Sequence, residues 1–350
     1  MLWTVLVGFV VTPAASAQSY WGVVESLEAV RGNAVLKCAD FLDDERHGWV
    51  AAVDAGDAVL FRTTDGGRTW ERIAVPDIGH DFEEIDFVDP NNGWWASKPV
   101  GTPPTPIRRT RNGGRTWVGE ALRNDEGTEI PWRYGNAYDI CMLSERDGYA
   151  SVSPISLGRS FDGTPRASHR TLLAYEPDHG AWRPIRTDFA VTSGKVFVYD
   201  PGRVWRARWP GEAWRSIVPI GGTAGGRRPD LEYTPMDLGT GHFGVYDIFF
   251  VNQIEGWICG SQSAVLHSED GGGTWERLDL RVGEHEATVF TAVTFESRVR
   301  GCLVSDIGIH MTTDRGRTWT FTRAPGMVGA WMSTCFAARI TPQPTGACTA

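Results

Sequence analysis

The sequence predicts an all-β fold, a β-propeller of four-stranded blades, and three observations support this prediction. One eight-residue motif, [Ser/Thr]-x-[Asp/Asn]-x-Gly-x-Thr-Trp, occurs at 63–70, 110–117, 268–275 and 312–319. Its closing tryptophans lie 47 residues apart in the first pair and 44 residues apart in the second, a period typical of propeller blades. The 41 glycines and 20 prolines among 350 residues suit short strands joined by tight turns.

The residue types of the motif indicate a structural role. Its Asp or Asn can accept backbone N–H groups two residues ahead in an Asx turn, and its Gly permits positive φ. Its Thr returns the chain to a strand, and its Trp supplies an apolar plate between neighbouring sheets. The predicted structural residues are Asp65, Gly67, Thr69, Trp70, Asn112, Gly114, Thr116, Trp117, Asp270, Gly272, Thr274, Trp275, Asp314, Gly316, Thr318 and Trp319.

Two weaker copies of the motif fill the long interval between the second and third copies. The segments 175–182 and 208–214 each keep a glycine and the closing tryptophan. Upstream of most motifs, an apolar strand end, a polar turn and a Gly-aromatic pair repeat, as in 250–257. The predicted blades are 37–75, 81–122, 136–187, 188–220, 243–280 and 287–324.

The two ends of the repeat region predict how the ring closes. The lead-in 18–36 contains a short amphipathic stretch that suggests an outer strand, and 327–340 resembles an innermost strand. Together they would complete a seventh blade by Velcro-type closure, which leaves no open sheet edge. Six blades in total is the alternative. Residues 18–340 are therefore predicted to form one propeller domain, followed by a tail at 341–350.

The N-terminus predicts export. Residues 2–11 are an apolar run, and Ala15-Ser16-Ala17 has the small-x-small form of a signal-peptidase site. No Lys or Arg precedes Arg31, so the usual basic start is missing, and an ordinary apolar strand is the alternative. We expect a signal peptide over 1–17 and a periplasmic, secreted or envelope-associated protein. The apolar run is too short for a membrane span.

Composition excludes some classes of function. The net charge of −9 and pI near 5.4 argue against nucleic-acid binding, which requires a basic surface. Four of six cysteines, Cys38, Cys141, Cys259 and Cys302, are expected to be free and most of them core-facing, while Cys335 and Cys348 are candidates for one disulfide. No metal site or cofactor is predicted, because Cys/His zinc spacing is absent and each motif holds one carboxylate.

The repeats resemble a known group of proteins. The motif is similar to the Asp-box, or bacterial neuraminidase repeat, of sialidase-type propellers, sortilin-type receptors and several glycosidases. The longer pattern from Gly256-Trp257-Ile-Cys-Gly260 to Trp275 resembles the photosystem II stability/assembly factor family. The resemblance spans roughly 35–325 and is poor between 120 and 235. It implies a non-catalytic scaffold that binds protein partners.

Candidate partner contacts lie in and near the irregular segments of the chain. The longest loop, 221–241, contains Arg227, Arg228 and Tyr233, and further arginines, Arg108, Arg109 and Arg111, surround the second motif. Long loops on a rigid scaffold often carry specificity, although a tolerated insertion is the alternative reading of this one.

Two other functions remain open. A sialidase-like or other exo-acting glycosidase would need three arginines, a Tyr/Glu pair and an acidic residue, but the Phe/Tyr-Arg-Ile-Pro motif of sialidases is absent. A carbohydrate- or cell-surface-binding module would use aromatic residues outside the motif, and Trp132 in a polar loop is the first candidate, beside Trp95 and Trp209. No Gly-x-Ser-x-Gly or phosphate-binding loop occurs.

Overall fold

The computed structural model describes residues 25–323, except 43, 45, 76–81, 98–104, 125–126, 131, 133–135, 156–169, 177, 185–194, 201–202, 209–211, 218–233, 240–242, 279, 281–286, 288 and 296. Within this part of the chain, no helix has the length and apolar character needed to cross a membrane. The signal peptide at 1–17, the tail at 327–340, and Cys335 and Cys348 lie outside the described residues and stay predictions.

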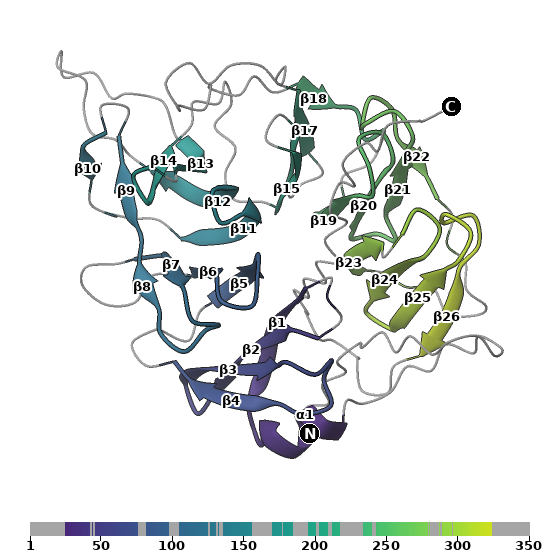
Figure 1. Cartoon of the computed structure of the whole chain (residues 1–350). Helices are drawn as coiled ribbons and strands as arrows, with labels where there is room; N and C mark the ends of the chain where they lie inside the picture. Colours follow the sequence, from purple (N-terminus) through teal and green to yellow (C-terminus); the bar gives the residue numbers. More distant parts are fainter. Residues whose placement is uncertain are drawn as a thin grey trace, which may run out of the picture.

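Within the described residues, six β-sheets surround a common centre, which confirms the predicted all-β propeller (Figure 1). Five sheets have four strands and one has six. We number them as blades 1 to 6 along the chain, and each of them overlaps a predicted unit. Contacts between innermost strands join blades 1 to 2, 2 to 3, 3 to 4, 4 to 5 and 5 to 6.

Blade 1 contains β1 (Val35–Phe41), β2 (Gly48–Asp54), β3 (Asp57–Thr63) and β4 (Glu71–Ala74); blade 2 contains β5 (Phe82–Phe87), β6 (Gly93–Ser97), β7 (Ile107–Thr110) and β8 (Val118–Gly119). Blade 3 contains β9 (Ala121–Arg123), β10 (Glu129–Ile130), β11 (Ala137–Ser144), β12 (Asp147–Ile155), β13 (Arg170–Glu176) and β14 (Ala181–Pro184). Blade 4 contains β15 (Lys195–Asp200), β16 (Arg203–Arg208), β17 (Glu212–Ile217) and β18 (Thr234–Met236). Blade 5 contains β19 (Val245–Phe250), β20 (Gly256–Gly260), β21 (Val265–Ser268) and β22 (Glu276–Arg277); blade 6 contains β23 (Phe290–Phe295), β24 (Gly301–Ser305), β25 (Gly308–Thr312) and β26 (Thr320–Arg323).

Two features differ from the prediction. The prediction of an outer strand in the lead-in is wrong for residues 25–31, because Glu25–Arg31 form helix α1. Glu, Leu, Ala and Arg favour a helix, and Leu27 packs on blade 1 with 1% exposure. In blade 3, the hairpin β9–β10 from the linker extends the outer edge, since β9 pairs in parallel with β14.

The repeated Gly-aromatic pair locks neighbouring blades together. At Gly48, a Cβ atom would lie 2.2 Å from the ring of Phe41, so only glycine lets this ring lie across the strand. The next residue, Trp49, stacks on Phe87 of blade 2 with centroids 3.7 Å apart and planes 2° apart. The same stack joins Trp205 to Phe250 at 4.1 Å and Trp257 to Phe295 at 3.7 Å. Because these rings are buried, each blade contributes core to the next.

Aspartates on the innermost strands form a second link between blades. Each accepts a backbone N–H from the innermost strand of the next blade, in the pairs Asp40–Phe87 (2.5 Å), Asp86–Met142, Asp139–Val196 (2.6 Å) and Asp247–Val293 (2.9 Å). Near the centre of the ring, Lys195 lies 3.1 Å from Glu84 and 3.4 Å from Asp139. Burial raises the pKa of Asp247 to about 6.

The four described cysteines are free, as predicted. Cys38, Cys259 and Cys302 are buried, and Cys141 is partly buried. Burial raises the pKa of the three buried thiols, so they act as small apolar side chains and not as nucleophiles.

Candidate functional site

The four intact Asp-boxes share one closed set of hydrogen bonds, which the first box illustrates. The Asp65 carboxylate accepts the backbone N–H of Thr69 at 2.9 Å and its hydroxyl at 2.7 Å. The Thr63 hydroxyl donates to Asp65 at 2.9 Å and accepts the N–H of Gly67 at 2.8 Å. The carboxylate therefore reaches four residues ahead, further than the expected Asx turn. Its bonds, above all those from Thr69, lower the pKa of Asp65 to about 2.

The other three boxes repeat these contacts around Asn112, Asp270 and Asp314. Their tryptophans pack edge-on against a phenylalanine of the same blade, for example Trp117 on Phe87 at 79°. The indole N–H of Trp117 donates to Gly114 O, and that of Trp319 to Gly316 O, both at 2.9 Å. The side-chain oxygens of all four boxes and these two indoles are therefore used inside the turn, as the predicted structural role requires.

A functional surface must therefore come from the variable positions of the boxes or from side chains outside them. On the third strand of four blades, a basic residue stands opposite the aromatic residue of the second strand. The pairs are Arg62–Trp49, Arg109–Trp94, Arg215–Trp205 and His267–Trp257. The Arg109 guanidinium lies 4.5 Å from the Trp94 ring, and the His267 ring stacks on Trp257 at 4.6 Å.

In three blades, this basic residue also contacts the following blade. Arg62 donates to Pro90 O at 3.4 Å, and Arg215 donates to Gly271 O at 3.2 Å. Arg109 lies 3.6 Å from Glu145. Each arginine thus ties one blade to a turn or box of its neighbour.

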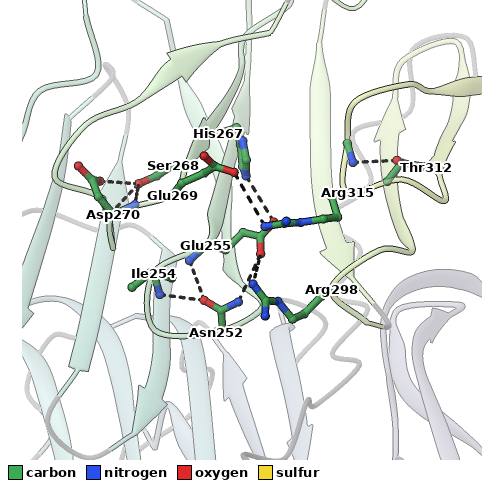
Figure 2. A network of polar contacts seen from close by, with 12 residues as sticks. Asn252, Ile254, Glu255, His267, Ser268, Glu269, Asp270, Arg298, Thr312 and Arg315 are labelled. Atoms are coloured by element: carbon green, nitrogen blue, oxygen red, sulfur yellow. Dashed lines mark hydrogen bonds and ion pairs between the residues drawn. The ribbon is translucent and has the colours of Figure 1, made fainter.

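Between blades 5 and 6, the polar contact runs in the opposite direction (Figure 2). Arg315, in the box of blade 6, reaches back to Glu255 in the turn between β19 and β20. Its Nε and Nη2 atoms both lie 3.0 Å from Glu255 Oε1, and Arg298 Nη2 lies 3.5 Å from Oε2. Glu255 is only 1% exposed. One buried carboxylate therefore holds two arginines in place.

Arg315 adopts a backbone conformation that favours glycine. Its φ is 66°, and the equivalent positions of the other three boxes are Gly66, Gly113 and Gly271 at 72°, 69° and 72°. A non-glycine residue with such a φ is uncommon and carries a cost in backbone strain. The ion pair with Glu255 helps to offset this cost.

Three side chains of the network offer atoms that suit a metal ion: Glu255, His267 and Glu269. One ligand atom from each lies within 4.8 Å of the others. His267 lies on β21, Glu269 directly follows this strand, and both belong to the network in Figure 2. His267 Nε2 is buried without a hydrogen-bond partner and lies 3.8 Å from Glu255 Oε1. Burial lowers the pKa of His267, which favours the neutral imidazole.

Exposed aliphatic side chains flank this network. Ile254 is 54% exposed and Val299 is 44% exposed, and they occupy the same turn position in blades 5 and 6, where their carbonyls accept a box N–H. Blades 1 and 2 have the exposed polar residues Arg46 and Asn91 at that position. We call the surface formed by Ile254, Glu269, Arg298, Val299 and Arg315 the blade 5–6 patch. It presents guanidinium donors beside apolar side chains.

Of the residues expected to contact a partner, some lie outside the described part of the chain and others are buried. Arg227, Arg228, Tyr233 and Trp209 lie outside the described residues. Trp132, expected on the surface, is 7% exposed and donates its indole N–H to Glu120 O at 2.9 Å, so it belongs to the core between blades 2 and 3. Trp95 is fully buried, and Arg109 is 6% exposed, whereas Arg111 lies on the surface.

One group of arginine, tyrosine and glutamate side chains lies inside the protein, between blades 2 and 3. Arg109 donates to the hydroxyl of Tyr175 at 2.7 Å, and Glu120 lies in the same interface between blades 2 and 3. Burial raises the pKa of Glu120 to about 7, although Arg109 and Arg111 favour its ionised form. Tyr175 is 1% exposed and Glu120 is 7% exposed, so this group does not form an open glycosidase site.

The blade 5–6 patch was not predicted. Its residues look like ordinary turn residues in the sequence, because their proximity depends on packing between two blades. The available signal was an aliphatic residue in a turn position that is polar in blades 1 and 2, together with His267-x-Glu269 leading into a box.

Comparisons with known proteins agree with this architecture. The family model "Photosynthesis system II assembly factor YCF48" matches residues 228–326. The chain is 23% identical to the chloroplast photosystem II stability/assembly factor HCF136 of Arabidopsis thaliana, with 71% of this chain and 69% of that protein covered. It is 25% identical to the photosystem II assembly protein Ycf48 of Thermosynechococcus vestitus, with 76% and 78% covered.

Solved structures show the same fold. A structure of YCF48 bound to a D1 peptide matches with a TM-score of 0.54 at 20% identity, over 82% of this chain and 79% of that chain. A xyloglucanase from Xanthomonas campestris matches with a TM-score of 0.57 at 14% identity, over 83% and 47%. The chain is therefore an Asp-box β-propeller similar to the photosystem II assembly factors.

Proposed function

We propose that this protein is an exported, non-catalytic propeller that binds a segment of a partner protein and acts as an assembly or stability scaffold. The observation that carries this proposal is the blade 5–6 patch, because it lies within 228–326, the part that the assembly-factor model matches. The relatives named as assembly factors and the YCF48 complex with a D1 peptide support the same function.

The chemistry of the patch suits a polypeptide ligand. Arg298 has a side-chain exposure of 62% and uses only part of its donor capacity on Glu255. Ile254 and Val299 provide exposed apolar area in the same patch. A partner segment with a carboxylate and aliphatic side chains would gain charge-assisted hydrogen bonds and apolar burial together.

Photo-crosslinking tests the location of the interface. A photoreactive residue is placed at Ile254 in one variant and at the equivalent Asn91 of blade 2 in another. We expect a discrete crosslinked partner with the first variant and none with the second. Equal crosslinking from both positions, or none from either, would argue against this face as the docking surface.

A glycosidase is the second candidate, because a xyloglucanase from Paenibacillus sp is 24% identical over 64% of this chain. The match covers 24% of that enzyme. The buried state of Glu120 and Tyr175 speaks against hydrolysis at that group. Release of reducing sugar from xyloglucan by the purified protein, well above a heat-treated control, would support the enzyme instead.

We also propose that 327–340 completes the ring as part of a seventh blade. In blade 6, Cys302, Val304, Ile309 and Met311 are buried, but none of the apolar clusters among the described residues includes them. A segment beyond Arg323 would explain this burial. Truncation after residue 324 should then lower thermal stability strongly, whereas removal of 341–350 should not.

Export remains part of the proposal. The apolar run at 2–11 and Ala15-Ser16-Ala17 support it. N-terminal sequencing of the protein recovered from its native cell should begin near Gln18, and an uncleaved Met1 would contradict cleavage at this site.

A further inference from the structure

The contact network between blades 5 and 6 holds more ligand atoms than its ion pairs use. Glu255 is 1% exposed and is bound by Arg315 and Arg298, yet His267 Nε2 lies 3.8 Å away without a hydrogen-bond partner. A buried polar atom without a partner indicates a group that the neighbouring protein atoms do not satisfy. Glu269, which directly follows β21, is 72% exposed and lies 3.9 Å from Arg315.

We propose that Glu255, His267 and Glu269 form a site for a divalent transition-metal ion, and that the ion and Arg315 compete for Glu255. One imidazole and two carboxylates suit Zn²⁺, with water in the fourth position. The ligand atoms lie within 4.8 Å of one another, so only small movements are needed to bring them around one ion.

The surroundings of each ligand fit this role. Stacking on Trp257, at 4.6 Å and 24°, fixes the His267 ring. Asn252 Nδ2 lies 3.4 Å from Glu255 Oε2, and the backbone N–H of Glu255 donates to Asn252 Oδ1 at 2.9 Å, so this turn orients the carboxylate. Groups that orient ligands in this way are typical of metal sites.

Arg315 holds the position beside Glu255 for which the ion would compete. Its guanidinium supplies the positive charge that Glu255 requires, and its side chain is 34% exposed, so it has a path to solvent. Its φ of 66° shows that the position would be filled more easily by glycine. Metal binding would release Arg315, and with it Arg298, from Glu255. The blade 5–6 patch would then become more basic, which couples metal occupancy to the docking of an acidic partner segment.

Titration of the purified full chain with Co²⁺ and Zn²⁺ tests the inference, and it needs no partner. Co²⁺ should give saturable visible absorption bands with an intensity typical of four-coordination, and Zn²⁺ should displace it at a stoichiometry of one. His267→Gln should abolish the bands. Glu269→Gln, at an exposed side chain whose loss leaves the core intact, should weaken binding about 10- to 100-fold. Arg315→Gly should tighten binding about 10-fold, because the competing cation is removed.

A matched control is His47→Gln, since His47 is another histidine beside a carboxylate, Asp44, in a blade turn. It should leave the titration unchanged. Absence of saturable binding by wild type, bands that survive in His267→Gln, or an Arg315→Gly variant that binds no tighter would each overturn the inference. Failure here leaves the photo-crosslinking result unaffected, so the two proposals fail separately.

Discussion

The blades with intact Asp-boxes and the irregular blade 3 solve the same packing problem in different ways. In blades 1, 2, 5 and 6, the polar groups of the box form hydrogen bonds with one another, and the sheet ends at its fourth strand. Blade 3 has lost that turn, and the hairpin β9–β10 is added beside β14 at its outer edge. The change brings Glu120 into the interface, where burial raises its pKa to about 7. A local, self-contained turn is thus replaced by a structure that depends on pH and on distant segments.

Among the blades with intact boxes, the aromatic stack between blades should contribute most to the free energy of unfolding. Trp257 is fully buried and stacks on Phe295 at 3.7 Å. We expect Trp257→Ala to reduce the free energy of unfolding by about 3–5 kcal/mol, since it removes apolar burial and leaves a cavity. Denaturant titration followed by far-UV circular dichroism measures this. Val118→Ala, at a 64% exposed site, is the control and should change stability by less than about 0.5 kcal/mol. A loss below about 1 kcal/mol for Trp257→Ala would contradict the proposed link between blades.

Glu120 should make the stability of the irregular blade 3 depend on pH. The folded pKa, about 7, exceeds the ordinary value of 4.5, so the folded state binds the proton more tightly than the unfolded state. This contribution is fully present below about pH 4.5 and is lost as the pH rises through about 7. Between pH 4.5 and pH 8, the wild type should lose up to about 3 kcal/mol of unfolding free energy that the Glu120→Gln variant does not lose. Parallel stability curves for both proteins would refute the assignment.

Removal of a box aspartate should have an intermediate effect. Asp270 accepts the N–H and the hydroxyl of Thr274 at 2.8 and 2.9 Å, and the Ser268 hydroxyl at 3.0 Å. Asp270→Ala removes these bonds, and by analogy with helix caps we expect a loss of about 1–2 kcal/mol. Asp270→Asn should recover most of it, because Asn112 fills the same role in the second box. Thermal unfolding of the three proteins side by side gives the comparison.

The corresponding change in the eroded box should have the smallest effect. Asp178 in blade 3 has a side-chain exposure of 66%, and its ion pair with Arg146 at 3.1 Å is equally open to solvent. Exposed pairs contribute little, so Asp178→Ala should cost less than about 0.5 kcal/mol. If Asp178→Ala reduces stability as much as Asp270→Ala, the eroded motif of blade 3 still stabilises its turn, which would contradict the difference between the two kinds of blade.

The sequence predicted what is encoded locally. The six units, the Gly-aromatic turns and the free state of Cys38, Cys141, Cys259 and Cys302 followed from repeated short patterns. The pairing of β9 with β14 joins a linker to a strand about sixty residues away and leaves no periodic signal. The same holds for Arg315 and Glu255, which are 60 residues apart and meet only because blades 5 and 6 are neighbours.

Helix α1 bears on the packing of blade 1. It covers the face of blade 1 that points away from blade 2, where Val50, Val59 and Phe61 are buried, and its Ser26 hydroxyl donates to Gly67 O at 2.5 Å. The helix therefore supplies part of the apolar packing of blade 1, and loss of residues 25–31 would leave Val50, Val59 and Phe61 partly open to solvent.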